Sequence, residues 1–253
     1  ALSRGMRAAV PDAELAIDGG AGAEPIGRSI VETDVAAWHD GLRRHHIEGP
    51  LPEIVAGVTT SATVNFYADQ LFLKEAGSRV RTPFHQDKPY FLVKGGEVAV
   101  CWVPVDRVGA DNGPMGYVRG SHRWGRTFKP SDFVTTTGTF PERDGVDLSG
   151  LDVLPAIDHE DPALVYFEAE PGDVIVHHWA TVHGSAGNVS ATAVRRAASI
   201  RYALEGCTFH QRPSSPEPFR FTDDRADGEP LENSDRFPGV WPRTSRSGDR
   251  IRD

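Results

Sequence analysis

Residues 82–91, TPFHQDKPYF, place an imidazole, His85, and a carboxylate, Asp87, on either side of a single glutamine. In a β-strand the side chains of residues i and i+2 point to the same face, so the two groups can converge on one point. Such a pair can share a proton or bind a metal ion together. A hydrogen-bonded pair with only a structural role is the alternative that these two residues leave open.

A third metal ligand is expected far along the chain, on a neighbouring strand. The segment GDVIVHHWATVHGSAGN offers His177, His178 and His183. His183 is the best candidate, because it closes an apolar strand and precedes a Gly-Ser-Ala-Gly turn, where a strand end would face an open cavity. The other two histidines lie deeper in the strand and are expected to be structural. Two imidazoles and one carboxylate with open positions form the facial triad of non-haem Fe(II) oxygenases.

The open positions of such a triad can accept O2 and a bidentate 2-oxo acid, whose distant carboxylate needs a cation. Arg195, in the strand-like segment RRAASIRYAL, can supply a bidentate guanidinium. Arg196 should face the opposite side of the sheet, because neighbouring side chains in a strand alternate. We therefore expect Arg195 to bind the cosubstrate and Arg196 to form a surface contact or a salt bridge.

The composition limits the classes of protein to which the chain can belong. Its 253 residues are 39% hydrophobic and 25% charged, which is ordinary for a soluble globular protein. The formal net charge of −9 argues against nucleic-acid binding, because phosphate recognition needs a basic surface. No apolar stretch approaches the ~18 residues of a membrane span, and no secretory signal is recognisable. The first residue is Ala, so the numbering is expected to start inside a longer gene product.

The number and positions of the cysteines indicate whether the protein belongs in an oxidising or a reducing compartment. The chain has two, Cys101 and Cys207, and Cys101 lies inside the apolar run EVAVCWVPV, which indicates a core position. A disulfide framework is therefore not expected, which favours a reducing, cytoplasmic compartment.

The elements that must position the candidate ligands fall into an N-terminal helical part and a longer strand-rich part. Residues 1–30 are rich in Gly, Ala and charge and are expected to be loosely ordered. A helix is predicted from Thr33 or Asp34, either of which can act as its N-cap, to about His46, and residues 51–60 predict a second short helix. Beyond them, β-branched and aromatic segments separated by Gly, Pro, Asp and Asn predict many short strands.

The strand-rich part is interrupted once and followed by a polar tail. Residues 129–162 are predicted to form a long insertion loop, and the tail from about Phe219 contains RFPGVWPR, which is expected to fold back onto the barrel. Many short strands after few helices favour an antiparallel sandwich or barrel. The chain is predicted to form one domain, 1–253, with the β core at 60–205 and a C-terminal tail at 206–253.

Four segments taken together, HQDKPYF, DNGPMGYVRGSHRWG, GDVIVHHWATVHGSAGN and RRAASIRY, resemble the phytanoyl-CoA dioxygenase family of Fe(II)/2-oxoglutarate oxygenases over residues 60–205. An isolated His-X-Asp is common by chance, whereas this order and spacing are specific. The resemblance implies a mainly β fold with flanking N-terminal helices, a double-stranded β-helix whose two sheets enclose iron. The iron ligands would be His85, Asp87 and His183, and Arg195 would hold the distal carboxylate of 2-oxoglutarate.

The resemblance also implies residues around the cosubstrate and the outcome of the reaction. The positions that touch or flank 2-oxoglutarate are Lys74, Gln86, Trp102 and Ser185. Fe(II), 2-oxoglutarate and O2 together would oxidise a small-molecule substrate and release succinate and CO2. Related halogenases have a small residue at the position of Asp87, so this carboxylate favours hydroxylation, or desaturation or ring closure, over halogenation.

The substrate itself is not indicated by the sequence, although the family acts on acyl-CoA esters, amino acids and natural-product intermediates. The candidate substrate residues are His122, Arg119, Arg123, Tyr90 and Phe91. The family often has Pro where this chain has Arg119. With Arg126 and Lys129, the two arginines form a basic segment that would attract an anionic substrate if it borders the cavity. An ordinary solvated loop is the alternative.

Two other functions remain possible on the same residues. A metal-dependent hydrolase or isomerase could use zinc at the triad, and a non-catalytic barrel could keep the fold and only bind a ligand. The hydrolase or isomerase gives Arg195 and the Gly-Ser turn no evident role. The non-catalytic barrel leaves an intact triad without a role.

Overall fold

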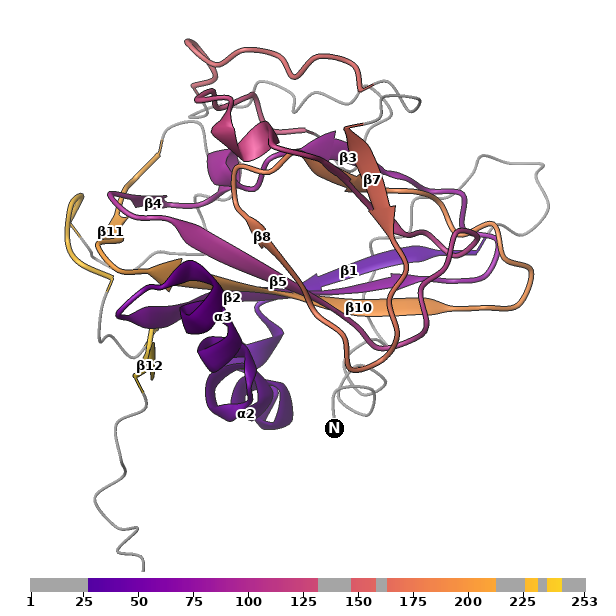
Figure 1. The fold of residues 1–253 in the computed structure, drawn as a ribbon, viewed down its shortest axis with the longest axis horizontal. Helices are drawn as coiled ribbons and strands as arrows, with labels where there is room; N and C mark the ends of the chain where they lie inside the picture. Colours follow the sequence, from indigo (N-terminus) through magenta and orange to yellow (C-terminus); the bar gives the residue numbers. More distant parts are fainter. Residues whose placement is uncertain (1–26, 132–146, 158–162, 213–225, 232–235, 243–253) are drawn as a thin grey trace, which may run out of the picture.

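The computed structural model describes residues 27–131, 147–157, 163–212, 226–231 and 236–242. Two antiparallel β-sheets lie over one another, and two short helices cover the outer side of the larger sheet (Figure 1). This is the predicted double-stranded β-helix, mainly β with helices from the N-terminal part of the chain.

The larger sheet has the strand order β1-β2-β10-β5-β8, and β12 pairs with the start of β2. Its strands are β1 (Ser29–Thr33), β2 (Val64–Lys74), β10 (Arg195–Leu204), β5 (Val98–Pro104), β8 (Ile175–His178) and β12 (Gly239–Trp241). β10 therefore joins two strands, β2 and β5, that precede it by far in the chain. Side chains of β10 alternate between the helix-covered outer face and the inner face that looks toward the second sheet.

The smaller sheet has the order β3-β9-β6-β7. Its strands are β3 (Thr82–His85), β9 (His183–Ser185), β6 (Met115–Val118) and β7 (Leu164–Phe167), and a separate pair is formed by β4 (Val93–Lys94) and β11 (Thr208–Phe209). Single 3-10 turns occur at η1 (Val35–Ala37), η2 (Lys88–Tyr90) and η3 (Ser121–Arg123).

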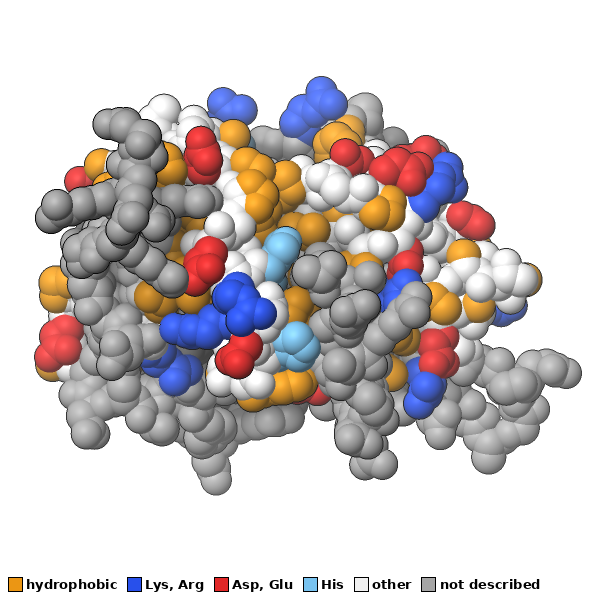
Figure 2. All heavy atoms as spheres, turned by 90° about the horizontal axis from the view of Figure 1, so that it is seen from below, with side chains coloured by type: hydrophobic (Ala, Val, Ile, Leu, Met, Phe, Trp, Pro, Cys, Tyr) orange, Lys and Arg blue, Asp and Glu red, His pale blue; other side chains and the backbone are white. Residues whose placement is uncertain are grey.

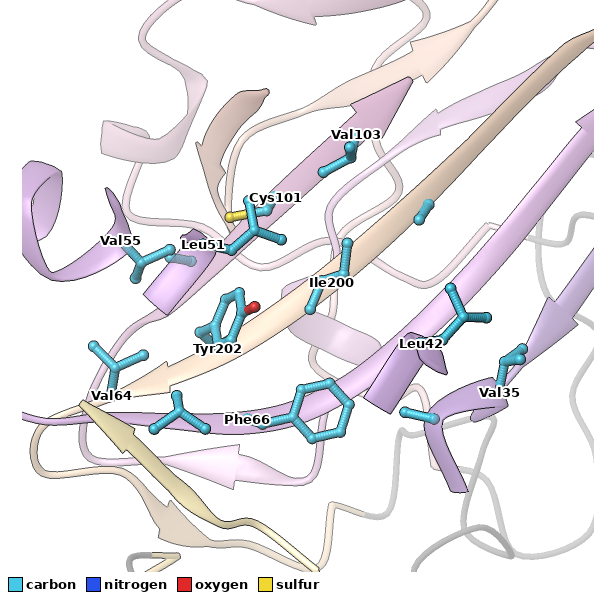
Figure 3. Close-up of a cluster of buried hydrophobic side chains, with 14 of the residues drawn as sticks. Val35, Leu42, Leu51, Val55, Val64, Phe66, Cys101, Val103, Ile200 and Tyr202 are labelled. Carbon is cyan, nitrogen blue, oxygen red and sulfur yellow. The ribbon is translucent and has the colours of Figure 1, made fainter. Parts of the chain in front are cut away.

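The helices α2 (Asp40–Glu48) and α3 (Leu51–Thr59) pack on the outer face of the larger sheet. Figure 3 shows Leu51 and Val55 beside Cys101 and Tyr202 in this layer. Leu42 of α2 and Leu51, Val55 and Ala56 of α3 are buried there, and burial of one apolar face is the main stabilisation available to helices of this length. No helix in the described part of the chain has the length and apolar character needed to cross a membrane.

The first helix differs from the prediction. Residues 29–33, SIVET, form β1 instead of loose chain and helix start, because β-branched residues there pair with β2. Asp34 precedes the 3-10 turn η1 as its N-cap residue, with a left-handed backbone and no side-chain capping hydrogen bond. The turn is held by Asp69, whose carboxylate accepts from the Ala36 N–H at 3.2 Å. The α-helix starts at Asp40, where His39 accepts from the Leu42 N–H.

The C-terminal segment folds back as predicted. β12 pairs with the start of β2, and the Asn65 side chain donates to the Phe237 carbonyl at 2.9 Å. Phe237 is buried. Of the predicted insertion loop, residues 132–146 and 158–162 lie outside the described residues, as do residues 1–26 of the predicted loose segment.

Figure 2 shows acidic and basic side chains interspersed with apolar ones over one face, without a continuous basic surface among the described residues.

Candidate metal centre and anion site

His85, Asp87 and His183 lie together where the two sheets enclose the interior of the barrel. His85 ends β3 and pairs in register with His183 at the start of β9. One ligand atom from each of the three residues lies within 4.8 Å of the others. The imidazole Nε2 atoms are 3.7 Å and 3.9 Å from the two oxygens of Asp87, too far for hydrogen bonds. An ion can therefore lie between them.

The way the chain brings Asp87 to this point differs from the prediction. β3 ends at His85, and Asp87 follows in a right-handed helical backbone conformation at the start of η2. The two side chains therefore converge through a turn that directly follows the strand, not through the i, i+2 alternation within it. The backbone N–H of Asp87 donates to the Trp179 carbonyl at 2.9 Å, and this hydrogen bond fixes the turn.

The hydrogen bonds at the other ring nitrogens set the histidine tautomers. Nδ1 of His85 lies 2.9 Å from the Pro83 carbonyl, and Nδ1 of His183 lies 2.9 Å from the Thr181 carbonyl. A carbonyl only accepts, so each Nδ1 carries the hydrogen and each Nε2 presents a lone pair toward Asp87. This is the arrangement in which neutral imidazoles bind a metal ion.

The charges at the triad are those of a metal site. Burial lowers the pKa of His183 well below its ordinary value, so its imidazole is neutral. Burial raises the pKa of Asp87, but His183, His85 and Arg201 more than offset this, so its carboxyl is ionised. One oxygen of Asp87, Oδ2, is buried and has no hydrogen-bond partner. An unpartnered buried carboxylate oxygen is unfavourable, and a cation would compensate it.

Gly184 sets the spacing between the two histidine strands. A Cβ atom at this position would lie 2.8 Å from the Thr82 carbonyl oxygen on β3. Any side chain would therefore push β3 away from β9 and separate His85 from His183. The glycine of the His-Gly-Ser motif is required by this close approach of two backbones.

Two charged side chains, Arg195 of β10 and Lys74 of β2, lie around Ser185, two residues beyond His183 on β9. Arg195 is buried, its Nη2 lies 3.5 Å from Ser185 Oγ, and its guanidinium lies 5.6 Å from the centre of the Trp102 ring. Lys74 is buried beside it and donates to Ser185 Oγ at 2.7 Å and to the Val80 and Ala186 carbonyls at 2.9 Å.

These two cations lack a counter-ion among the described residues. The Nε of Arg195 has no hydrogen-bond partner, and the described chain gives Arg195 and Lys74 no carboxylate partner. Burial and the charge of Arg195 lower the pKa of Lys74, and burial lowers the pKa of Arg195 to about 10. Two buried cations side by side form a site for an anion, and a carboxylate would fit the fork of Arg195.

The neighbouring Arg196 points the other way, as the alternation predicts. Its guanidinium forms a salt bridge with Asp106, with the Nη2 atom 2.5 Å from Oδ1, at the partly exposed outer side of the sheet. Only Arg195 of this pair faces the interior.

Gln86, predicted to touch the cosubstrate, uses its amide for backbone contacts. Its Nε2 donates to the Ala180 carbonyl at 2.9 Å and to the Arg126 carbonyl at 3.2 Å, and its Oε1 accepts from the Phe128 N–H at 3.1 Å. The residue between the two triad members therefore joins the triad turn to the segment after η3.

The candidate substrate residues divide into a buried pair and an exposed group. Tyr90 is buried with its ring 5.9 Å from the His85 ring, and Phe91 packs against Trp179. By contrast, His122, Arg119 and Arg123 are exposed on and beside η3. Arg126 of the basic segment is neutralised by Asp152 at 2.5 Å.

Two site residues were not predicted. Tyr117 is buried on β6, stacks on the His183 ring at 5.8 Å, and its hydroxyl has no hydrogen-bond partner. The His177 ring lies 4.5 Å from the His183 ring, so this histidine adjoins the triad, whereas the more exposed His178 pairs with Glu97. Strand alternation gives a signal for His177, because one of two adjacent strand residues must face inward. Tyr117 offers no comparable signal.

The fold and the site together define a class of protein, the cupin-like double-stranded β-helix with a histidine and carboxylate centre suited to a metal ion. Residues 12–197 match the family model described as phytanoyl-CoA dioxygenase (PhyH). The chain belongs to the phytanoyl-CoA dioxygenase family.

Curated relatives agree with this assignment. The chain is 28% identical to human peroxisomal phytanoyl-CoA dioxygenase over 165 residues, which are 63% of this chain and 46% of the relative. It is 27% identical to a probable phytanoyl-CoA dioxygenase of Caenorhabditis elegans over 124 residues, 49% of this chain and 36% of the relative. The chain thus spans less than half the length of these relatives.

Solved structures share the fold. One is a non-haem α-ketoglutarate-dependent carbocyclase from nogalamycin biosynthesis, with 20% identity, a TM-score of 0.65, and coverage of 95% of this chain and 84% of that chain. Another is the epimerase SnoN in complex with Fe3+, α-ketoglutarate and nogalamycin RO, with 22% identity, a TM-score of 0.66, and coverage of 94% and 87%.

Proposed function

We propose that this protein is an Fe(II)- and 2-oxoglutarate-dependent dioxygenase that hydroxylates a C–H bond of a small molecule. The observation that carries the proposal is the buried triad, with two imidazoles and an ionised carboxylate around one point, next to two buried cations that form no salt bridge with the described residues. Membership of the phytanoyl-CoA dioxygenase family supports it.

The donor set fits iron. His85, Asp87 and His183 would hold the metal through two nitrogens and one oxygen, which leaves positions open for other ligands. When bound, iron with O2 and 2-oxoglutarate supplies the oxidation of the substrate and yields succinate and CO2. The Nδ1 hydrogen bonds to the Pro83 and Thr181 carbonyls keep both imidazoles oriented for this task.

The anion site fits 2-oxoglutarate. Arg195 would bind its distal carboxylate through two N–H groups, while Ser185, held by Lys74, adds a hydroxyl. The indole of Trp102 packs against the guanidinium and keeps water from it. Tyr117 adds an unpartnered hydroxyl near the charges of both Asp87 and Arg195.

Hydroxylation is the proposed outcome because Asp87 supplies a third protein ligand, which leaves no site for a halide at that position. Carbocyclase and epimerase activities occur on the same fold, so the position of the substrate relative to the metal selects among oxidative outcomes. A zinc hydrolase would leave Arg195 and Lys74 without an anion, and a non-catalytic barrel would leave the triad without a role. We also propose that residues 1–253 act as a single oxygenase domain with its core at 60–205.

Alanine substitution of each triad residue tests the proposal. His85→Ala, Asp87→Ala and His183→Ala should each lose bound iron and nearly all succinate formation from 2-oxoglutarate while circular dichroism stays unchanged. His178→Ala is the matched control, since this histidine adjoins the site in sequence but binds Glu97 near the surface. Full iron content and turnover in any triad variant would refute the ligand assignment.

A further inference from the structure

Arg201 is a second buried arginine on the inner face of β10. Arg195, Ala197, Ser199 and Arg201 share that face, whereas Ile200 and its outward neighbours pack under the helices. Arg201 lies six residue steps beyond Arg195 along the strand, which corresponds to a distance of about 20 Å. A five-carbon diacid at Arg195 is too short to reach Arg201, so the second arginine must serve another group.

The guanidinium of Arg201 has an unused donor and no salt bridge among the described residues. Its Nη2 donates to Gln70 Oε1 and its Nη1 lies 3.4 Å from the Ser199 carbonyl, but Nε has no partner. No carboxylate of the described residues forms a salt bridge with it, and Asp87 acts on it only at longer range, although only 6% of the residue is exposed. An arginine carries five N–H groups, so two neutral acceptors leave it incompletely satisfied. A buried cation in this state is costly unless an anion binds it.

Arg201 lies between the triad and partly exposed residues of β2. Its charge acts on both Asp87 and His177, which places it within electrostatic reach of the metal centre. On the inner face of β2, Gln70, whose side chain accepts from Arg201, is partly exposed, and so is Phe72. The ring of Phe91, 5.7 Å from the guanidinium carbon, provides an apolar wall.

We propose that Arg201 binds a carboxylate of the primary substrate, which is therefore an organic acid with an apolar body packed against Phe91. This inference rests on the proposed function, since it names the substrate class of that same site. The proposal places anion recognition in the interior and not at the exposed basic segment. In that segment Arg126 is already paired with Asp152, and water screens the remaining charges.

The test uses two probes of nearly the same shape, phenylacetate and phenylacetamide, which differ in charge. The protein is loaded anaerobically with Fe(II) and saturating 2-oxoglutarate, so that the probes cannot occupy the site at Arg195, and binding is measured by calorimetry. Phenylacetate should bind at least about tenfold more tightly, because hydrogen bonds to a charged group contribute more than neutral ones. Arg201→Gln should abolish this preference, and Arg196→Gln, on the outer face, should keep it.

Gln70→Glu provides a second variant that retains Arg201. It places a carboxylate of the protein on the same guanidinium, so the preference for phenylacetate should fall as it does in Arg201→Gln, even if that variant does not fold. Equal binding of the two probes by the unmodified protein, or a preference that survives both substitutions, would overturn the role of Arg201. If 2-oxoglutarate itself fails to bind in the loading step, the proposed function fails instead.

Discussion

Arg195 is the side chain that we propose binds the distal carboxylate of the cosubstrate. Its guanidinium is buried with an unpartnered Nε, so a carboxylate gains charge-assisted bonds there that water does not compete for. Each such bond contributes about 1.5–3 kcal/mol. Arg195→Ala should therefore raise the 2-oxoglutarate concentration for half-maximal succinate formation by about tenfold or more. Arg196→Ala should leave it unchanged, and the reverse result would exchange the roles of the two residues.

Removal of the Tyr117 hydroxyl should have opposite effects on the stability of the ligand-free protein and on the binding of 2-oxoglutarate. A buried hydroxyl without a partner destabilises the ligand-free protein, so Tyr117→Phe should raise its free energy of unfolding by about 1 kcal/mol. If the hydroxyl donates to 2-oxoglutarate, the same change should weaken cosubstrate binding several-fold. Urea denaturation and a 2-oxoglutarate titration measure the two effects. A stability gain with unchanged binding would assign Tyr117 a packing role only.

Among individual site residues, the sequence predicted those with metal-binding or charged side chains at a recognisable spacing. His85, Asp87, His183 and Arg195 are such residues, and the structure brings the first three together and places Arg195 in the interior. Tyr117 was not predicted, because a tyrosine in an apolar strand is ordinary and its place beside His183 depends on the β6–β9 pairing. That pairing joins residues far apart in the chain, which local patterns do not specify.

Among the elements, helix α2 carries a pH-sensitive contribution to stability. Burial, together with the neighbouring His46, lowers the pKa of His45 from 6.5 to about 4. Between these pH values the unfolded chain binds a proton that the folded protein does not, so stability falls as the pH decreases from about 6.5 to about 4. In metal-free protein, the free energy of unfolding should therefore depend less on pH in His45→Gln than in the unmodified chain. Parallel pH profiles would contradict this role.

Element boundaries were harder to predict than element types. Helix α3 and the returning tail were correct, since a compact apolar pattern and an aromatic-proline cluster are local signals. The start of the first helix was wrong, because Thr33 and Asp34 satisfy the capping rules while β1 is formed by pairing with β2, a tertiary effect. The turn that carries Asp87 was missed for a related reason, as its conformation is fixed by the distant Trp179 carbonyl.

For the molecule as a whole, unpaired buried charges predict strong stabilisation by ligands. Iron and 2-oxoglutarate bind the folded chain at groups that are scattered in the unfolded one, and a ligand at 100 times its Kd adds about 2.7 kcal/mol. For a protein of this size that corresponds to a rise in Tm of about 5–10 °C. Adding Fe(II) anaerobically at this concentration should produce this shift, 2-oxoglutarate should increase it further, and chelation should reverse it. Asp87→Ala should remove the response to iron, whereas an unchanged response would place the metal elsewhere.

The position of β10 between β2 and β5 also has a consequence for synthesis. Roughly 90 residues are translated after Pro104 before Arg195 leaves the ribosome, which takes about 5–20 s. During this interval the facing edges of β2 and β5 have no strand between them, and exposed edges pair readily with other chains. The yield of native protein should therefore depend on protection of the nascent chain during these seconds, by chaperones or by low temperature, and chains that stop short of Arg195 should aggregate.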